Sequence, residues 1–211
     1  EMARLHLLCR TWHGSSCEHG ARVLIERWAP PAAQFGLEAR WSFTPVDGKT
    51  GGASAGAALP GSCLAAKVEM TPYGHWPERI PRAGVRLRIP ETGWTASWVG
   101  ETDIAYADMP GVNPDGFGCA KLEELWDVGV KPQEGGHRPG LKVLELRGEG
   151  RALTIVPRSE VGWSASPWSE QELAQAGHWE DLPDSNRTFV WLDAIQDGIG
   201  TRSCGPDARP E

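Results

Sequence analysis

The stretch FGLEARWSFTP, residues 35–45, alternates apolar and polar side chains and decides the fold class. A period of two residues is typical of a half-buried strand, because successive side chains of a strand point to opposite faces. One face of this stretch carries Leu37, Ala39, Trp41 and Phe43. The stretch CLAAKVEMTP, residues 63–72, alternates in the same way. The sequence therefore predicts strands that bury one face.

Similar short apolar runs recur along the chain, separated by turn signals such as HGSS, GEG and PDSN. The runs are RLHLLCRTW, ARVLIERWAP, GVRLRIP, TASWVG, LKVLELRG, RALTIVP and TFVWLDAI. Roughly nine or ten strands with brief connections favour antiparallel pairing. We therefore predict an all-β protein, an antiparallel β-sandwich.

One short helix is predicted near residues 169–177. Ser169 is a suitable N-cap, and Glu172 stands three residues later, as a capping box requires. Good helix formers follow as far as Gly177. A second stretch, CAKLEELWDV at residues 119–128, suits a short helix or a strand equally well.

Composition excludes several classes of protein. The 211 residues are 40% hydrophobic and 23% charged, which is typical of a globular domain. A net charge of −7, with no basic cluster among aromatics, argues against nucleic acid as a partner. No apolar run approaches the roughly 18 residues of a membrane span. Five unevenly spaced cysteines indicate reduced thiols and a cytoplasmic protein.

A cluster of thiols and imidazoles lies near the N-terminus: Cys9, His13, Cys17 and His19. Tetrahedral zinc accepts two thiolates and two imidazoles, but structural zinc sites usually space their ligand pairs more tightly. These four residues also straddle the predicted HGSS turn. Cys9 shares a strand face with Leu5 and Leu7, so we interpret it as a buried thiol and predict no metal site.

No motif predicts a catalytic residue in this chain. Glycoside hydrolysis needs an acid and a nucleophile or base on either side of the scissile bond, and no pair of carboxylates is held in such a pattern. We interpret the candidates as a solvated acidic surface: Glu123, Glu124, Asp103, Asp108, Asp181 and Asp184. Nucleophile elbows and phosphate-binding glycine loops are also missing. The turn GGHRP, with His137 and Arg138, fits a ligand-facing loop or a solvated hairpin connection equally well.

Five segments in order resemble the C-terminal domain of glycoside hydrolase family 2 β-galactosidases, which is part of the small subunit in two-chain members. They are RIPRAGVRLRIP, ASWVGETDIAYAD, VGVKPQEGGHRPGLKVLEL, GWSASPWSEQELAQAGHWEDLP and FVWLDAIQDGIGTRSCGPDARPE. The resemblance covers residues 20–211 in outline and 78–211 in motif detail. Tyr106 and Asp108 match the family's Y-x-D, whereas its Gly-Pro and Glu have no counterpart here. Its ENGNR turn is matched at Glu134, Gly136 and Arg138.

The resemblance implies a supersandwich of the galactose-mutarotase-like type. We expect residues 1–211 to form a single β-sandwich domain, whether as a fragment, a split subunit or a degenerate relative. In the family this domain is non-catalytic and closes one side of the galactose pocket beside a separate catalytic barrel, which supplies both glutamates. The implied partners are a β-galactoside such as lactose, the barrel or large subunit, and further copies in a homo-oligomer. No cofactor is implied for this chain, although parent enzymes often hold Mg²⁺ or Na⁺ in the barrel.

The resemblance also implies which residues line the pocket: Glu134, His137, Arg138, Ser203, Cys204 and Gly205. Cys204 falls where some relatives stack a Trp on bound sugar. In the closing run, Gly198, Gly200, Gly205 and Pro206 would shape a loop beside the pocket, because glycine and proline have unusual backbone preferences.

A second hypothesis is a stand-alone carbohydrate-binding or aldose-epimerising protein, since the mutarotase-like fold also hosts such enzymes. It would need an acid and a base, either Glu134 with His137 or His178 with a nearby carboxylate.

Overall fold

The computed structural model describes residues 8–18, 21–29, 34–46, 63–76, 82–90, 92–105, 113–126 and 130–196, with the backbone alone for 8–18. Its backbone contacts divide the chain into two compact units, Glu1–Glu78 and Arg79–Glu211, which we describe one at a time. The expectation of a single domain over residues 1–211 stays a prediction.

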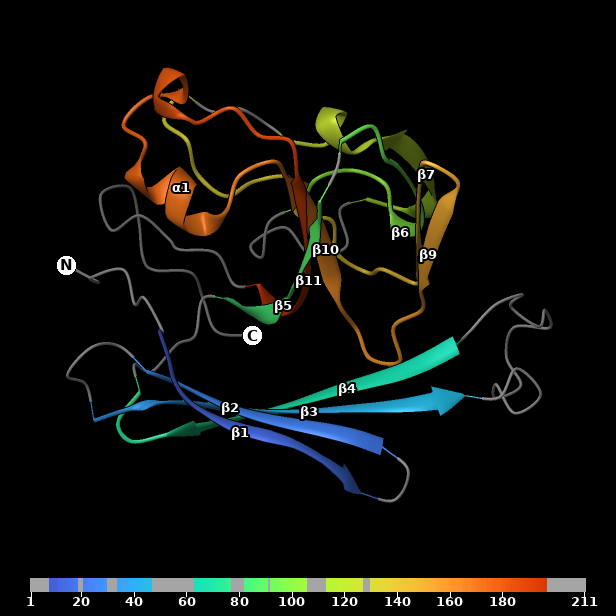
Figure 1. Cartoon of the computed structure of the whole chain (residues 1–211). Helices are drawn as coiled ribbons and strands as arrows, with labels where there is room; N and C mark the ends of the chain where they lie inside the picture. The colour runs from blue at the N-terminus through green and yellow to red at the C-terminus, as the bar shows by residue number, and fades with distance from the viewer. Residues whose placement is uncertain are drawn as a thin grey trace. The chain divides into compact units, whose positions relative to one another are not determined.

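The first unit contains one antiparallel sheet in the order β1-β2-β3-β4 (Figure 1). Its strands are β1 (Leu8–Glu18), β2 (Ala21–Ala29), β3 (Gly36–Val46) and β4 (Cys63–Tyr73). Trp41 of β3 stands between Leu24 of β2 and Val68 of β4. The alternation in residues 35–45 therefore predicted the strand and its apolar face, but burial does not alternate along β3, where most residues of both faces are half-buried.

The predicted turn at HGSS was wrong. Strand β1 runs through these residues to Glu18, and its pairing with β2 shifts register between His13 and Ser16. Such an irregularity lets a strand take up extra residues without ending, so a glycine and two serines need not mark a turn.

The second unit contains two antiparallel sheets, with the orders β10-β11-β5 and β7-β6-β8-β9 (Figure 1). The first sheet consists of β5 (Arg82–Ile89), β10 (Gly162–Ser166) and β11 (Thr188–Gln196). The second consists of β6 (Thr95–Glu101), β7 (Asp115–Lys121), β8 (Val143–Gly148) and β9 (Arg151–Ile155). Two 3-10 helices, η1 (Leu122–Glu124) and η2 (Trp179–Asp181), and the helix α1 (Glu170–Gln175) complete the described elements.

The core of this unit lies between its two sheets. Trp98 of β6 packs edge-on against Trp163 of β10, with ring centroids 5.1 Å apart. Leu144 and Leu146 of β8 and Val190 of β11 are fully buried in the same cluster. Two sheets that share one apolar core form a β-sandwich. The prediction of an antiparallel all-β fold with one short α-helix is thus confirmed.

Helix α1 begins as predicted. Ser169 Oγ accepts a hydrogen bond from the Glu172 backbone N–H at 3.3 Å, and the Glu172 carboxylate accepts one from the Ser169 N–H at 2.8 Å. The ambiguous stretch at 119–128 ends strand β7 and then forms η1, while its residues 127 and 128 lie outside the described part. No helix among the described residues is long and apolar enough to cross a membrane.

Two strands, β7 and β10, were not predicted as strands. All five residues of β10 are buried, so burial does not alternate along it, although its short sequence GWSAS alternates apolar and polar side chains. Strand β7 contains two glycines, which are typical of a turn. Here Gly118 lies against the Trp98 ring, and a Cβ at this position would be only 2.1 Å from it. That glycine serves close packing between neighbouring strands.

Candidate functional site

Asp193 of β11 is the centre of a buried polar cluster in the second unit, and its side chain is only 1% exposed. Arg82 of β5 donates two hydrogen bonds to it, from Nε to Oδ1 at 2.8 Å and from Nη2 to Oδ2 at 3.0 Å. Two parallel charge-assisted hydrogen bonds fix the relative orientation of a guanidinium and a carboxylate. The pair therefore fastens β5 to the end of β11.

Two of the predicted pocket residues join this cluster. Arg82 Nη1 donates to Glu134 Oε2, so that one guanidinium holds two carboxylates. His137 Nδ1 lies 3.5 Å from Asp193 Oδ2, a distance that forms an ion pair when the imidazole is protonated. The structure thus brings Glu134 and His137 together through Arg82 and Asp193.

Sequence reasoning missed Arg82 and Asp193, although glycines in the adjoining strands carry a signal. A Cβ at Gly84 would lie 2.7 Å from Asp193 Oδ1, and one at Gly162 would lie 2.1 Å from His137 Cε1. Glycine inside a strand often marks a close approach of another group. Here the two glycines make room for the carboxylate and the imidazole.

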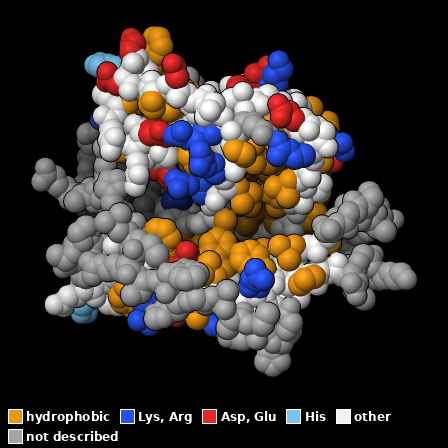
Figure 2. All heavy atoms as spheres, in the orientation of Figure 1, with side chains coloured by type: hydrophobic (Ala, Val, Ile, Leu, Met, Phe, Trp, Pro, Cys, Tyr) orange, Lys and Arg blue, Asp and Glu red, His pale blue; other side chains and the backbone are white. Residues whose placement is uncertain are grey.

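The electrostatics favour a charged Arg82. Burial lowers the pKa of Arg82, but its hydrogen bonds with Asp193 and the charges of Asp193 and Glu134 outweigh burial and raise that pKa. The guanidinium also stacks 5.2 Å from the Trp191 ring centroid. Figure 2 shows Lys and Arg side chains gathered near β5 and α1 of Figure 1, with acidic side chains beside them.

Arg138 turns toward the core. Its residue is 7% exposed, and its guanidinium lies 5.3 Å from the Trp98 ring centroid and 5.7 Å from that of Trp163. Nη1 donates to the Gly136 carbonyl at 2.7 Å. Burial lowers the pKa of Arg138, although the charge of Asp103 acts in the opposite direction. The guanidinium of Arg138 therefore contacts aromatic rings and a carbonyl. The alternative of a solvated hairpin connection predicted that it would face water.

The turn that carries these residues is held by backbone hydrogen bonds. Arg138 and Trp163 exchange two of them at 2.8 Å, and the Ala105 N–H donates to the His137 carbonyl at 3.1 Å. Gly136 has φ of +74°, a conformation that favours glycine. The segment from Glu134 to Arg138 is thereby fixed against β10.

Several predicted site residues lie outside the described part of the chain. Ser203, Cys204, Gly205 and the other closing-loop residues are among them, as are Tyr106 and Asp108. Whether they approach the Asp193 cluster stays a prediction. For the zinc hypothesis, Cys9, His13 and Cys17 lie on β1, but their side chains and His19 are not described. Among the described residues, no group of three His, Cys, Asp or Glu could hold a metal ion.

Carboxylates considered as catalytic candidates serve as hydrogen-bond acceptors at chain turns. Glu123 accepts from the Gly93 N–H at 2.6 Å, and Asp181 accepts from the N–H groups of Gly177 and His178 at 3.0 and 2.9 Å. Glu124 accepts from the Lys121 N–H at 3.3 Å. These contacts support a structural role for the three carboxylates.

The second hypothesis, aldose epimerisation, needs an available acid and base. The Glu134 carboxylate is bonded to Arg82, and the His137 ring lies against Gly162. His178 is exposed, and the nearby carboxylate of Asp181 is bonded to backbone N–H groups. We therefore assign no acid–base pair to these residues, and the hypothesis stays a prediction.

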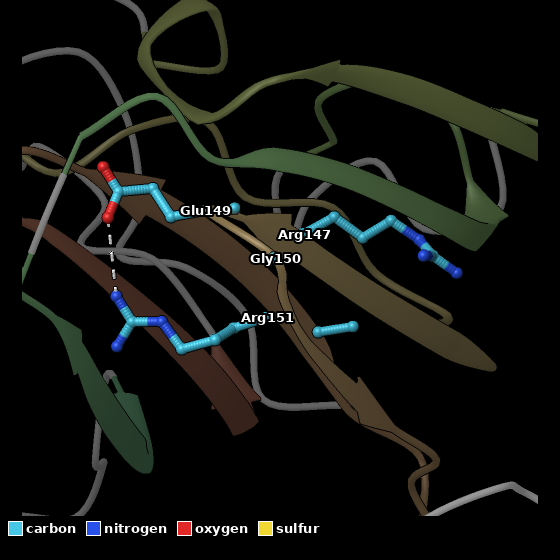
Figure 3. A pocket seen from close by; sticks show the side chains of 6 residues that line it. Arg147, Glu149, Gly150 and Arg151 are labelled. Atoms are coloured by element: carbon cyan, nitrogen blue, oxygen red, sulfur yellow. Dashed lines mark ion pairs between the residues drawn. The ribbon is translucent and has the colours of Figure 1, made fainter.

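A surface pocket lies at the β8–β9 turn, away from the predicted site residues (Figure 3). Its lining is Arg147, Gly148, Glu149, Gly150, Arg151 and Ala152. Glu149 and Arg151 form an ion pair of 3.7 Å across the turn, where Glu149 has φ of +46°. The side chains are those of an exposed hairpin tip, so we assign no chemistry to this pocket.

Comparison with known proteins identifies similar sequences. Residues 59–211 match the family model described as "Beta galactosidase small chain". A beta-galactosidase of Arthrobacter sp. (strain B7) is 33% identical over 160 residues, covering 72% of this chain and 16% of the relative. That of Staphylococcus xylosus is 24% identical, covering 61% and 13%. That of Halalkalibacterium halodurans is 34% identical over 83 residues, covering 38% and 8%. The chain spans 16% or less of the length of these relatives.

Proposed function

Since the chain belongs to the β-galactosidase small-chain family, we propose that it is the non-catalytic part of a β-galactosidase. In this proposal it supports and closes one side of a galactose pocket, while a separate catalytic barrel supplies the glutamates that hydrolyse terminal β-galactosides. The names of the similar proteins support the activity, and the small share of their length that the chain spans supports a larger catalytic partner.

The observation that carries the proposal is the Asp193 cluster. Arg82, Glu134 and Asp193 join β5, the 134–138 turn and β11, and β11 leads directly into the closing run that contains Ser203, Cys204 and Gly205. A loop that contacts substrate must start from a rigid support, because misplaced contacts lose binding energy. The buried Arg82–Asp193 ion pair provides such a support, and the more exposed Glu134 adds to it. We propose that the closing run forms the pocket wall.

The test is hydrolysis of a chromogenic β-galactoside. We expect no activity from this chain alone, and activity after addition of the barrel-containing chain encoded with it. If barrel and chain are one polypeptide, deletion of residues 197–211 in the full-length enzyme should raise KM for the galactoside. Robust hydrolysis by the isolated chain would contradict the proposal, and so would an unchanged KM after the deletion.

A further inference from the structure

An apolar row crosses the sheet β7-β6-β8-β9 of the second unit. Val99 of β6 pairs with Phe117 of β7 on one side and with Val143 of β8 on the other. Phe117 is 69% exposed and Val99 is 40% exposed. Val156, which directly follows β9, is 53% exposed. We call Phe117, Val99 and Val143 the apolar row.

The row lies on the face of the sheet that points away from the core. Trp98 and Leu144, the chain neighbours of Val99 and Val143, point to the opposite face and are 4% and 0% exposed. Neighbouring residues of a strand alternate between faces, so the row cannot belong to the core. On β6, β7 and β8, the cross-strand positions beyond the row on the same face are polar or charged, apart from Cys119: Ser97, Glu145, Thr95, Lys121 and Arg147.

An exposed aromatic ring beside valines is unfavourable in water, and contiguous apolar patches of this kind mark interaction surfaces. Charged residues also border the row on its other side, where Glu101 of β6 pairs with Asp115 of β7. An apolar centre with a polar rim is the usual composition of a protein–protein interface.

We propose that the apolar row docks the catalytic part of the β-galactosidase, an inference that rests on the proposed function. The chain spans only 16% of the length of the Arthrobacter relative. Most of such an enzyme therefore lies outside this chain and must bury some of its surface. The apolar row is suited to that contact because it combines a large exposed aromatic ring with little charge.

Native Cys119 is a probe of this surface. It lies on the same face, two residues beyond Phe117 in β7, and it is a free, exposed cysteine with Sγ 3.4 Å from Ser97 Oγ. A maleimide label on the Cys119 peptide can be quantified by mass spectrometry, with the denatured chain as the reference for full labelling. We expect labelling of the isolated chain and at least about tenfold slower labelling once the catalytic chain is bound.

The variant Phe117→Asp should weaken association with the catalytic chain by about tenfold or more, because a buried aromatic anchor is replaced by a charge. Thr95→Asp is the matched control. It adds the same charge to the same face, between Lys121 and Arg147, where a carboxylate has basic neighbours. Association of the control should remain near that of the unsubstituted chain, as measured by light scattering or interferometry.

The outcomes separate the two proposals. Protection of Cys119 together with selective loss of binding by Phe117→Asp supports the docking surface. The docking surface is overturned if the two chains associate and are active while Cys119 is still freely labelled. It is also overturned if Phe117→Asp binds normally. Either result leaves the proposed function intact. If Cys119 is already protected in the isolated chain and dilution removes this protection, a second copy of the chain covers the row. That result overturns the proposal. Failure of the unsubstituted chain to bind or activate any catalytic chain overturns both.

Discussion

At the scale of single residues, the contact between Arg82 and Asp193 distinguishes this chain from a sandwich held by apolar packing alone. The side chains are 18% and 1% exposed, so the ion pair is largely removed from water. Removal of one partner from a buried ion pair leaves a charge without compensation, which costs far more than loss of an exposed pair. The same guanidinium also holds Glu134, so the stability of the fold and the position of Glu134 both depend on Arg82.

We expect Asp193→Asn to lower the free energy of unfolding by about 3 to 5 kcal/mol, because Arg82 would keep its buried charge without its main partner. Urea denaturation followed by tryptophan fluorescence measures this change. Glu69→Gln is the control, since Glu69 and its partner Lys67 have side chains 51% and 67% exposed. Its unfolding midpoint should hardly move. Equal effects of the two substitutions would contradict the role assigned to the buried pair.

At the scale of elements, the start of helix α1 combines a capping box with an ion pair. Glu172 accepts hydrogen bonds from Ser169 and also contacts Arg187 Nη2. Burial raises the pKa of Glu172, but the hydrogen bonds from Ser169 and Arg187 outweigh burial, so the pKa lies below its ordinary value of 4.5. A six-residue helix has little stability of its own and depends on such contacts.

The lowered pKa gives the stability of this element a defined pH dependence. A carboxyl whose folded pKa is depressed contributes stability that is present above its unfolded pKa and is lost as pH falls through the folded pKa. We therefore expect the chain to lose stability as pH falls below 4.5, the ordinary value. Glu172→Gln should be less stable at pH 7 and should show a smaller loss on acidification. Denaturation midpoints across this pH range measure both effects.

Ser169→Ala provides a second variant of the same cap, and it should cost about 1 kcal/mol at pH 7. If Glu172→Gln keeps the full acid-induced loss of stability, the capping box is not its source.

At the scale of the whole molecule, the described core lies between the two sheets of the second unit, and the strands differ in how fully their neighbours protect them. Strands β6, β8 and β11 each have a partner on both sides, whereas β7 and β9 are edge strands. Leu144, Leu146 and Val190 on the central strands are 0% exposed, and Leu153 of β9 is 41% exposed.

We expect amide hydrogen exchange to be slowest in β8 and β11 and faster in β9, because an edge strand opens without disruption of the core. Exchange on the whole chain, followed by peptide mapping, gives the comparison. Similar protection of β9 and β8 would indicate that something covers the edge of this sheet and would contradict the exposure assigned to Leu153.

Sequence patterns predicted most of the strands because alternation reports which residues face a core. The 35–45 stretch showed its apolar face, and the Ser169–Glu172 spacing located the helix start. The patterns failed where a strand is short and small residues dominate it, as in β10, and where glycines serve packing, as in β7. They also failed at HGSS, where β1 continues past residues typical of a turn.

The candidate site was predicted only in part. Resemblance to a family indicated Glu134, His137 and Arg138, which lie close together in the chain. Arg82 and Asp193 are 111 residues apart, and although both stand in segments that resemble the family, nothing in either segment indicates that the two side chains meet. Pairing of β5 with β11 brings them together, so their contact is a property of sheet topology and could not be predicted from spacing.

The sequence by itself determined the antiparallel all-β class, the capped helix and membership of the β-galactosidase small-chain family, because each depends on local periodicity or on ordered motifs. Tertiary structure decided which charges are buried together and which apolar side chains remain exposed. The periodicity of Val99 and Val143 is that of any strand residue, and only the position of the core shows that they face outward. Burial depends on what packs against a face, and residues distant in the chain supply that packing.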